Sequence, residues 1–381
     1  MATLRIRNFA HMAEVSIGLG DLTILVGPQG TGKSLALQWL KVALDGRQLV
    51  SALRDAGQNV SNPAFLIDLL FGVGMGAAWH NGATNVEFDR KAILLGNIGR
   101  LGNGKERVFF IPAHRAMLIS DGWAAPFQKL TAETPAVARL FSQNLFDRFS
   151  AKDGSELFPL DRVLKREYRD LIDDAVFHGG KVGVEEDPQH AKRLRLSHGS
   201  AQLPFMTWTA GQREFTPLLL GLYHLLPPRK FLKQPDIEYV VIEEPEMGLH
   251  PQAVTVFMLL VLDLLWRGYK VVLSTHSPLV LTVAWMLRRM QETKAPWKLI
   301  CDAFGVGTSA PLKKVAEAAL RAKVRTHLLR FESDRRVHSK DVSTLDPESE
   351  DDDVSGWGGL AGFSSQFADA VRKAVNQAAA K

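Results

Sequence analysis

The sequence predicts an α/β fold with a mixed, largely parallel core sheet, an inserted helical arm and a small C-terminal α/β appendage. Two observations favour this fold class. The apolar run at residues 22–26 is followed by a glycine-rich loop and then by helical spacing, which gives the order strand, loop, helix. From residue 212 onward, helix and strand patterns alternate, and this alternation is typical of parallel strands joined by helices.

The first third of the chain predicts four strands and two helices. The run at residues 22–26 is apolar almost throughout, as expected for a strand buried on both faces. A helix is expected from Lys33 to about Leu44, and a second helix is expected to end before Gly72. The expected strands are residues 4–7, 14–17, 22–26 and 108–111, and the second helix is residues 62–71.

Helical spacing dominates the next segment. Residues 134–177 predict two or three helices, interrupted near Gly154, that form an inserted arm. Residues 181–208 alternate in the manner of strands. No heptad pattern is sustained, which argues against a long coiled-coil arm. The elements expected after this segment are a helix at 212–226, a strand at 239–243, a helix after Pro251, a strand at 270–274 and a helix after Pro278.

These patterns divide the chain into four parts. The two parts of the core are residues 1–133 and 181–305, and the helical insertion is residues 134–180. Residues 306–381 form the appendage, which we expect to contact a partner or a second copy. The appendage combines a basic stretch at residues 313–340 with an acidic run at 348–353, and it ends in a short expected helix with Phe367, Val371 and Val375 at helical spacing.

The composition is that of a soluble globular protein. The chain has 381 residues, 46% of them hydrophobic, and a formal charge of +5, which permits an acidic partner without requiring one. A single cysteine, Cys301, excludes an intramolecular disulfide and a multi-cysteine zinc site. The N-terminus lacks the pattern of a signal peptide, and the apolar segment at residues 254–266 is too short to cross a bilayer. We therefore expect a cytoplasmic protein.

A complete phosphate-binding loop lies between the strand at residues 22–26 and the following helix. Its glycines let backbone N–H groups close around phosphates, and the helix N-terminus favours anions. In this pattern Lys33 reaches the β- and γ-phosphates, and Ser34 offers its hydroxyl to Mg²⁺. A chance match is the alternative, which the complete pattern in the required context disfavours. The loop residues are Gly27, Pro28, Gln29, Gly30, Thr31, Gly32, Lys33 and Ser34.

Two adjacent glutamates end the apolar strand at residues 239–243. A site that hydrolyses a nucleotide needs an acid for the metal and a group that acts on the attacking water. Glu243 is the candidate for Mg²⁺, and Glu244 is the candidate that orients or deprotonates the water. Two solvated carboxylates at a strand end are the alternative, and this alternative is weaker once the phosphate-binding loop is considered.

Two further segments are candidates for the same site. His276 follows the strand at residues 270–274 and is a candidate contact of the γ-phosphate, although a histidine at a strand end is more often structural. The run Thr209, Ala210, Gly211 and Gln212 precedes an amphipathic helix and could leave its N-terminus free for an anion, or could be a plain helix cap.

The order of these motifs resembles that of ABC-type ATPases. Residues 243–251 and 274–278, with residues 6–9 before the loop, are similar to the branch that contains the overcoming-lysogenization-defect (OLD) and SMC-related ATPases. The resemblance covers about residues 4–280. It implies ATP and Mg²⁺ as ligands and a head-to-tail homodimer or larger homo-oligomer with two ATP molecules between subunits. A lone subunit is then expected to hydrolyse ATP slowly.

The resemblance also assigns residues. Thr209 to Gln212 resemble the signature loop that meets the ATP of the opposite subunit, residues 248–251 resemble the segment that crosses the dimer interface, and His276 resembles the switch histidine. The signature is Thr-Ala-Gly-Gln in place of Ser-Gly-Gly-Gln, and no residue is recognisable as the glutamine loop. These departures leave open how hydrolysis is coupled to a partner.

Residues 111–115, 341–347 and 357–360, with the central insertion, resemble stand-alone ATPase subunits of bacterial anti-phage systems. The similarity is first to the PARIS system, whose ATPase works with a Toprim nuclease, and second to Septu, whose ATPase works with an HNH nuclease. It implies a sensor and scaffold that holds a separate effector nuclease and then activates or releases it. An acidic viral protein or DNA are further possible partners.

Alternatives stay open at several points. An SMC-like ATPase of DNA repair or chromosome maintenance and a transporter subunit are the other function classes. The acidic triplet at residues 351–353 has the spelling of a Toprim metal site, but it lies in a charge run without a preceding apolar strand. Arg115 could pair with an acidic residue across the sheet or contact phosphate at the dimer edge. The basic stretch at residues 313–340 could bind a partner or be solvated.

Overall fold

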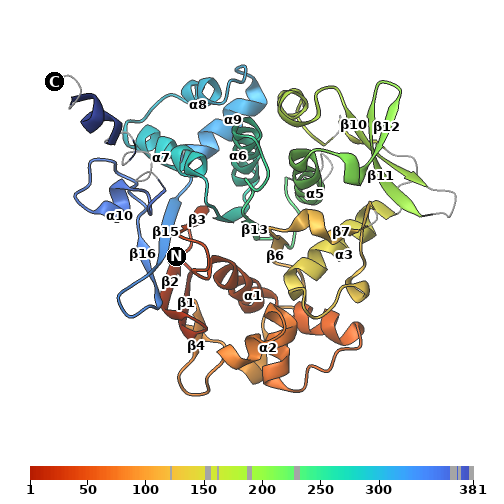
Figure 1. Ribbon diagram of the computed structural model, residues 1–381, viewed down its shortest axis with the longest axis vertical. Coiled ribbons are helices and arrows are strands. Elements are labelled where there is room, and N and C mark those ends of the chain that lie inside the picture. Colours follow the sequence, from red (N-terminus) through yellow and green to blue (C-terminus); the bar gives the residue numbers. More distant parts are fainter. Residues whose placement is uncertain are drawn as a thin grey trace.

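The computed structural model describes residues 1–120, 122–150, 156–160, 163–186, 191–226, 232–360, 367 and 370–376. A ten-stranded mixed sheet forms the centre of the molecule, and it confirms the α/β fold class (Figure 1). Five neighbouring strand pairs are parallel and four are antiparallel. The strand order is β5 (Lys91–Ala92), β4 (Asn85–Phe88), β1 (Thr3–Phe9), β2 (Met12–Gly18), β16 (Val337–Asp341), β15 (Val324–Phe331), β3 (Leu22–Val26), β14 (Lys270–Ser274), β13 (Tyr239–Glu243) and β6 (Val108–Ile111).

Helices cover both faces of this sheet. Alternate residues of a strand point to opposite faces, so in β13 Val240 and Ile242 pack into one core and Val241 into the other. The first core includes α5 (Ala210–Leu225), α6 (Pro251–Trp266), α7 (Pro278–Glu292), α8 (Lys298–Ala303) and α9 (Ala310–Ala319). The second includes α1 (Lys33–Asp55) and α2 (Pro63–Phe71).

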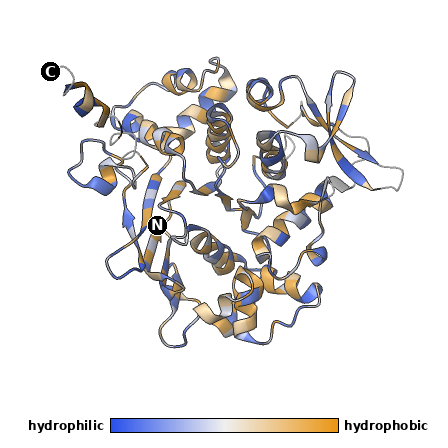
Figure 2. Cartoon of the chain, viewed as in Figure 1, coloured by the Kyte–Doolittle hydropathy of each residue, from blue (hydrophilic) through white to orange (hydrophobic). Residues whose placement is uncertain are grey.

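Helix α6 is the most deeply buried of these helices. Hydrophobic residues cover it almost completely in Figure 2, and its leucines and valines pack on the sheet and on α7 and α9. None of the helices formed by the described residues combines the length and apolar composition that crossing a membrane requires.

Helix α1 extends eleven residues beyond its expected end near Leu44. The helix kinks at Asp45, which has φ −127°. The Asp45 carboxylate accepts hydrogen bonds from the backbone N–H groups of Arg107 (2.9 Å) and Val108 (2.8 Å) and from Lys41 Nζ (2.9 Å). These tertiary bonds hold the kinked helix together beyond the end that the sequence predicts near Leu44.

The region expected to be a helical arm has a different structure. Helix α3 (Ala136–Ser150) packs against β6, α1 and α5, and therefore belongs to the core. Beyond it, four antiparallel strands form a separate sheet, called the inserted sheet below. The division expected at residue 180 falls inside this sheet, because Phe158 in β9 pairs with Val182 in β10. Its strands are β9 (Glu156–Phe158), β10 (Lys181–Glu186), β11 (Lys192–His198) and β12 (Ala201–Pro204).

Buried charge attaches the inserted sheet to the core. Two elements between β9 and β10, α4 (Arg166–Ile172) and a π-helix at Asp173–Phe177, pack against α6. Asp263 of α6 is almost fully buried and accepts hydrogen bonds from Lys165, from Tyr168 Oη (3.1 Å) and from Arg267 Nε (2.6 Å). A lone buried carboxylate would be costly, so these three donors are what allow Asp263 to lie there.

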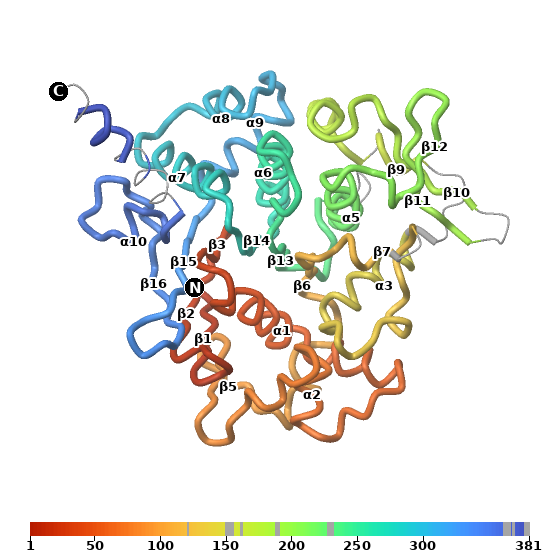
Figure 3. Tube along the Cα trace, viewed as in Figure 1, coloured from red at the N-terminus to blue at the C-terminus, as the bar shows by residue number. Residues whose placement is uncertain are grey.

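The C-terminal segment also differs from its expected position as an appendage to the core. β15 pairs in parallel with β3, and β16 pairs in parallel with β2, so this hairpin closes the gap between the first strands of the chain. Figure 3 shows the blue C-terminal part returning beside the red N-terminal strands. Only the last described residues, 367 and 370–376, match a terminal extension; they are helical and expose Phe367, Val371 and Val375.

The acidic run and part of the basic stretch pair with each other. The Nζ atom of Lys340 lies 2.7 Å from carboxylate oxygens of both Asp351 and Asp353, and Arg330 also binds Asp353. Asp351 caps the short helix α10 (Asp352–Ser355). The carboxylates of Asp351 and Asp353 are thus paired with basic side chains of β15 and β16, and these residues form a charge cluster within the chain.

Candidate functional site

The glycine-rich loop at residues 27–34 connects β3 to α1 as the sequence predicts. Gly27, Gly30 and Gly32 have φ values of 139°, 75° and 83°, a region that favours glycine. A Cβ on Gly27 would stand 2.0 Å from the carbonyl oxygen of Leu329 in β15. The C-terminal hairpin therefore limits the shape of this loop.

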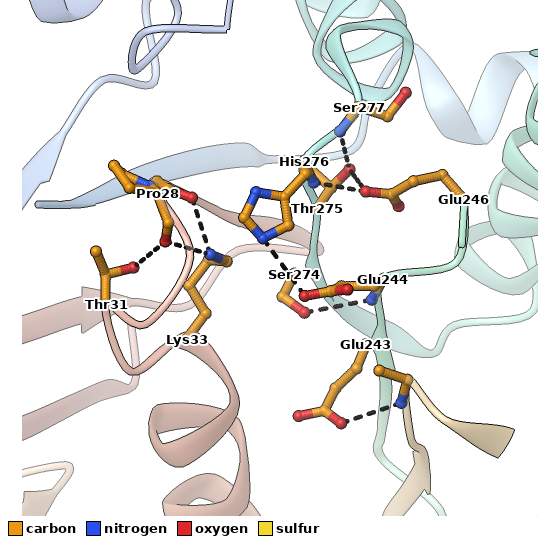
Figure 4. A network of polar contacts seen from close by, with 12 residues as sticks. Pro28, Thr31, Lys33, Glu243, Glu244, Glu246, Ser274, Thr275, His276 and Ser277 are labelled. Atoms are coloured by element: carbon orange, nitrogen blue, oxygen red, sulfur yellow. Dashed lines mark hydrogen bonds and ion pairs between the residues drawn. The ribbon is translucent and has the colours of Figure 1, made fainter. Parts of the chain in front are cut away.

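Lys33 folds back over the loop. Its Nζ donates hydrogen bonds to the carbonyl oxygens of Gly27 (2.8 Å) and Pro28 (2.9 Å), as Figure 4 shows, and Thr31 Oγ1 donates to Pro28 (2.8 Å). Burial lowers the pKa of Lys33 to about 8, although the carboxylates of Glu244 and Glu246 act to raise it. The ammonium group thus lies in a site where an anion would stabilise its charge.

Glu243 lies at the end of β13, buried beside the loop. Its Oε2 accepts a hydrogen bond from the Ala113 N–H (3.2 Å), and its Oε1 is buried without a hydrogen-bond partner among the described residues. Burial raises the pKa of Glu243 to about 7, against the lowering effects of the Ser34 hydroxyl and the Ala113 amide. A buried carboxylate oxygen with a free acceptor site, beside a hydroxyl, fits the oxygen ligands that Mg²⁺ prefers.

Glu244 faces His276 across the ends of two neighbouring strands. The carboxylate Oε1 of Glu244 lies 3.4 Å from Nε2 of His276, and the Glu244 N–H donates to the Ser274 carbonyl oxygen (2.9 Å) (Figure 4). Glu244 has φ 39°, a left-handed conformation that is uncommon outside glycine. The two side chains that the sequence proposes for the water and the γ-phosphate therefore lie together.

Glu246 is a site residue that the sequence did not single out. Its Oε1 accepts hydrogen bonds from Thr275 Oγ1 (2.8 Å) and from the His276 N–H (2.5 Å), so it holds the backbone that carries the histidine (Figure 4). A signal was present in the sequence: Glu246 follows the strand at residues 239–243 and His276 follows the strand at residues 270–274, and neighbouring parallel strands end at one sheet edge.

Thr209 to Gln212 form the N-terminus of α5 and make a capping box. Thr209 Oγ1 accepts from the Gln212 N–H (3.3 Å), and Gln212 Oε1 accepts from the Thr209 N–H (3.2 Å). The Gln212 amide also donates to the Val176 carbonyl oxygen (3.1 Å). Within the described parts of the chain, the side-chain hydrogen bonds of this turn stay on α5 and residue 176, and none reaches the phosphate-binding loop.

Arg115 is fully buried behind the acidic turn. An ion pair with a carboxylate, one of the two possibilities that the sequence raised, is present: Arg115 Nε lies 3.9 Å from Oε2 of Glu214. A phosphate contact stays a prediction, and the hydrogen bonds of Arg115 go to carbonyl oxygens. The acceptors are the carbonyl oxygens of Pro112, Ala113, Glu214, Glu243, Glu244 and Pro245.

Comparison with known proteins identifies a partial family match. A family model described as "AAA domain, putative AbiEii toxin, Type IV TA system" matches residues 124–282. This segment is less than half of the chain; it includes the acidic turn and His276, and the phosphate-binding loop precedes it. The match supports an AAA-type ATPase domain. No curated protein matches the chain.

Three solved structures are similar to the chain. The first is an SMC head bound to the C-winged helix domain of ScpA, with TM-score 0.41 and 10% identity, covering 89% of this chain and 96% of that one. The second is the SMC head domain from Thermotoga maritima, with TM-score 0.37, 12% identity and coverage of 89% and 97%. The third, an SMC head with an extended coiled coil bound to the C-terminal domain of ScpA from Pyrococcus furiosus, has TM-score 0.39, 11% identity and coverage of 90% and 96%.

Proposed function

We propose that this protein binds ATP with Mg²⁺ and hydrolyses it. The observation that carries the proposal is the meeting of the Lys33 loop, the buried Glu243 carboxylate and the Glu244–His276 pair at one edge of the sheet. Lys33 and the loop amides would hold the phosphates, and Ser34 and Glu243 would hold the metal. Bound Mg²⁺ would neutralise charge on the phosphate oxygens.

Glu244 is the proposed general base. It takes a proton from the attacking water as the water oxygen bonds to the γ-phosphorus and the bond to the bridging oxygen of ADP breaks. His276 lies within reach of the Glu244 carboxylate and orients it, while Glu246 fixes the backbone of His276. Glu243, which is deeply buried, is suited to the metal and less suited to a water that must enter and leave.

Assembly is the second part of the proposal. Thr209 and Ala210 are exposed at the N-terminus of α5, where they are accessible to a second copy. We infer that the active form is a head-to-tail dimer in which this turn meets the ATP held by the opposite subunit, so that hydrolysis by a lone subunit is slow. Light scattering with ATP and Mg²⁺ tests this, and a chain that stays monomeric under those conditions would count against it.

The biological role that we propose is a sensor and scaffold of an anti-phage defence system that holds a separate effector nuclease. A Toprim nuclease is the first candidate for this partner and an HNH nuclease the second. The description of the matching family model, which names a toxin of a type IV TA system, is in keeping with a role in defence. Co-purification with the product of the neighbouring gene, with and without ATP, tests this role; recovery of repair proteins alone would favour an SMC-like ATPase.

Two substitutions test the chemistry. Lys33→Ala is expected to abolish ATP binding, and Glu244→Gln to retain binding while lowering kcat at least 100-fold and accumulating an ATP-bound dimer. Glu238→Gln is the matched control, since Glu238 lies before the opposite end of the same strand, where it pairs with Arg107 and Lys270. Hydrolysis by Glu244→Gln at the wild-type rate would remove Glu244 from the mechanism.

The pKa of Lys33 gives a pH test of the same site. The free protein holds Lys33 with a pKa of about 8, and bound phosphate would raise that pKa, so binding above this pH takes up a proton. Affinity should be nearly constant below about pH 7 and should fall about fivefold from pH 8 to pH 9. Titration of a fluorescent ATP analogue measures it, and affinity that rises with pH would contradict the role of Lys33.

A further inference from the structure

The guanidinium group of Arg115 is fully buried; its hydrogen bonds go to carbonyl oxygens, and the Glu214 carboxylate lies 3.9 Å from its Nε. Burial lowers its pKa to about 10, so the group keeps its charge at neutral pH. A buried charge is costly unless polar groups surround it, and here carbonyl oxygens do so. The acceptor distances are 3.0 Å to Glu214, 3.2 Å to Pro245, 3.3 Å to Ala113 and Glu243, 3.4 Å to Pro112 and 3.5 Å to Glu244.

Three of these carbonyl groups belong to the turn that aims Glu244. The chain bends sharply after β13, with Glu244 in a left-handed conformation that costs roughly 1–2 kcal/mol for a residue with a Cβ. The turn directs the carbonyl oxygens of residues 243–245 to one point, where Arg115 is their donor. Without that donor, buried acceptors would lose their hydrogen bonds and the turn would relax.

The same guanidinium also holds α5. Its Nε donates to the carbonyl oxygen of Glu214, in the first turns of α5 beyond the Thr209–Gln212 cap, of which Thr209 and Ala210 are exposed. A rigid planar group that binds two elements keeps their separation fixed. A displacement of the first turns of α5 therefore moves the atom that supports Glu244.

We propose that Arg115 is a positioning residue that couples the N-terminus of α5 to the Glu244 turn. A contact made at Thr209–Gln212 changes the orientation of Glu244 through Arg115. Arg115 itself does not contact the substrate. This inference rests on the proposed function for its effect on hydrolysis, but the mechanical link exists whether or not ATP is the substrate.

The first test compares Arg115→Lys with Arg139→Lys. Arg139 is the matched control because it is also almost fully buried but lies in α3 over the Phe127 ring. Arg115→Lys keeps the charge and loses the planar fork, so kcat should fall at least tenfold while the Kd for ATP stays within about twofold. The control should keep both values. An unchanged kcat for Arg115→Lys, or equal losses of kcat for both variants, overturns the proposal.

The second test needs no hydrolysis. Thr209→Ala removes the exposed cap of α5, and amide hydrogen exchange should then rise at residues 209–213 and also at residues 244–247. In an Arg115→Lys background, the same change should raise exchange on α5 and add nothing at residues 244–247. Exchange confined to α5 in the wild-type background would overturn the coupling. If the wild type hydrolyses no ATP, the proposed function fails, and this measurement still decides the role of Arg115.

Discussion

The inserted sheet of β9 to β12 and the C-terminal hairpin of β15 and β16 both lie outside the nucleotide motifs. The hairpin is part of the main sheet, whereas the inserted sheet is separate from it. The hairpin is at the centre of the main sheet and touches the phosphate-binding loop at Gly27. The strands of the inserted sheet pair with one another, and side chains around Asp263 attach it to α6. Distance along the chain is therefore a poor guide to which region supports the site.

Truncation should show the largest effect. A chain ending at residue 305 loses β15, β16 and α9, and with them seven leucine and valine side chains that are at most 2% exposed: Leu312, Val315, Leu328, Leu329, Val337, Val342 and Leu345. Each contributes roughly 2 kcal/mol, which together matches the 5–15 kcal/mol of a whole domain. We expect no cooperative thermal transition by circular dichroism.

The matched control for that truncation ends at residue 360. Phe367, Val371 and Val375 are more than half exposed, so their removal should leave Tm within about 2 °C of the full chain. A chain ending at 305 that melts cooperatively would show that the hairpin is an appendage after all.

Gly27→Ala should give the next largest effect. An alanine Cβ at this position overlaps the Leu329 carbonyl oxygen and needs an unfavourable φ, for a combined cost of about 4 kcal/mol. Gly30→Ala is the control: its φ is also positive, but nothing lies within 4 Å of the added Cβ, so about 1 kcal/mol is expected. Urea unfolding without nucleotide measures both, and equal losses would mean that β15 does not limit the loop.

Asp263→Asn tests the attachment of the inserted sheet. The change leaves Lys165 and Arg267 without their carboxylate and should cost about 3 kcal/mol. Limited proteolysis should then cut within residues 156–204 before it cuts the main sheet. Asp170→Asn, at an exposed ion pair of α4, should change neither stability nor cleavage. Simultaneous loss of both regions would show that the inserted sheet is not a separable unit.

The sequence predicts the elements next to the motifs well. The strands at residues 22–26, 239–243 and 270–274 and the helices that follow them are confirmed. Apolar strands buried on both faces have strong local patterns, and so do helices that begin at a proline, as α6 and α7 do. The meeting of Glu244 with His276 also follows from the sequence, since parallel strands bring their ends to one edge.

What the sequence did not predict depends on contacts between distant residues. Nothing local in residues 324–341 indicates insertion between β2 and β3, because neighbours in a parallel sheet are chosen by tertiary packing. The length of α1 depends on bonds from Asp45 to residues 107 and 108. The role of Arg115 depends on a turn that lies more than 120 residues away.

The charge cluster of the hairpin should give the smallest effect. Hydrogen bonds from Lys340 lower the pKa of Asp351, and those carboxylates raise the pKa of Lys340. The cluster therefore stabilises the fold between about pH 4 and pH 10; its contribution is lost as pH falls through the pKa of Asp351 or rises through that of Lys340.

Lys340→Ala should lower Tm by about 2 °C at pH 7 and low salt, and by less in 1 M NaCl, where charges are screened beyond about 3 Å. Lys314→Ala removes the same charge from the exposed face of α9 and should leave Tm unchanged. A loss that persists in 1 M NaCl would mean that Lys340 contributes through packing of its alkyl chain, as a residue of the core sheet does, and not through its charge.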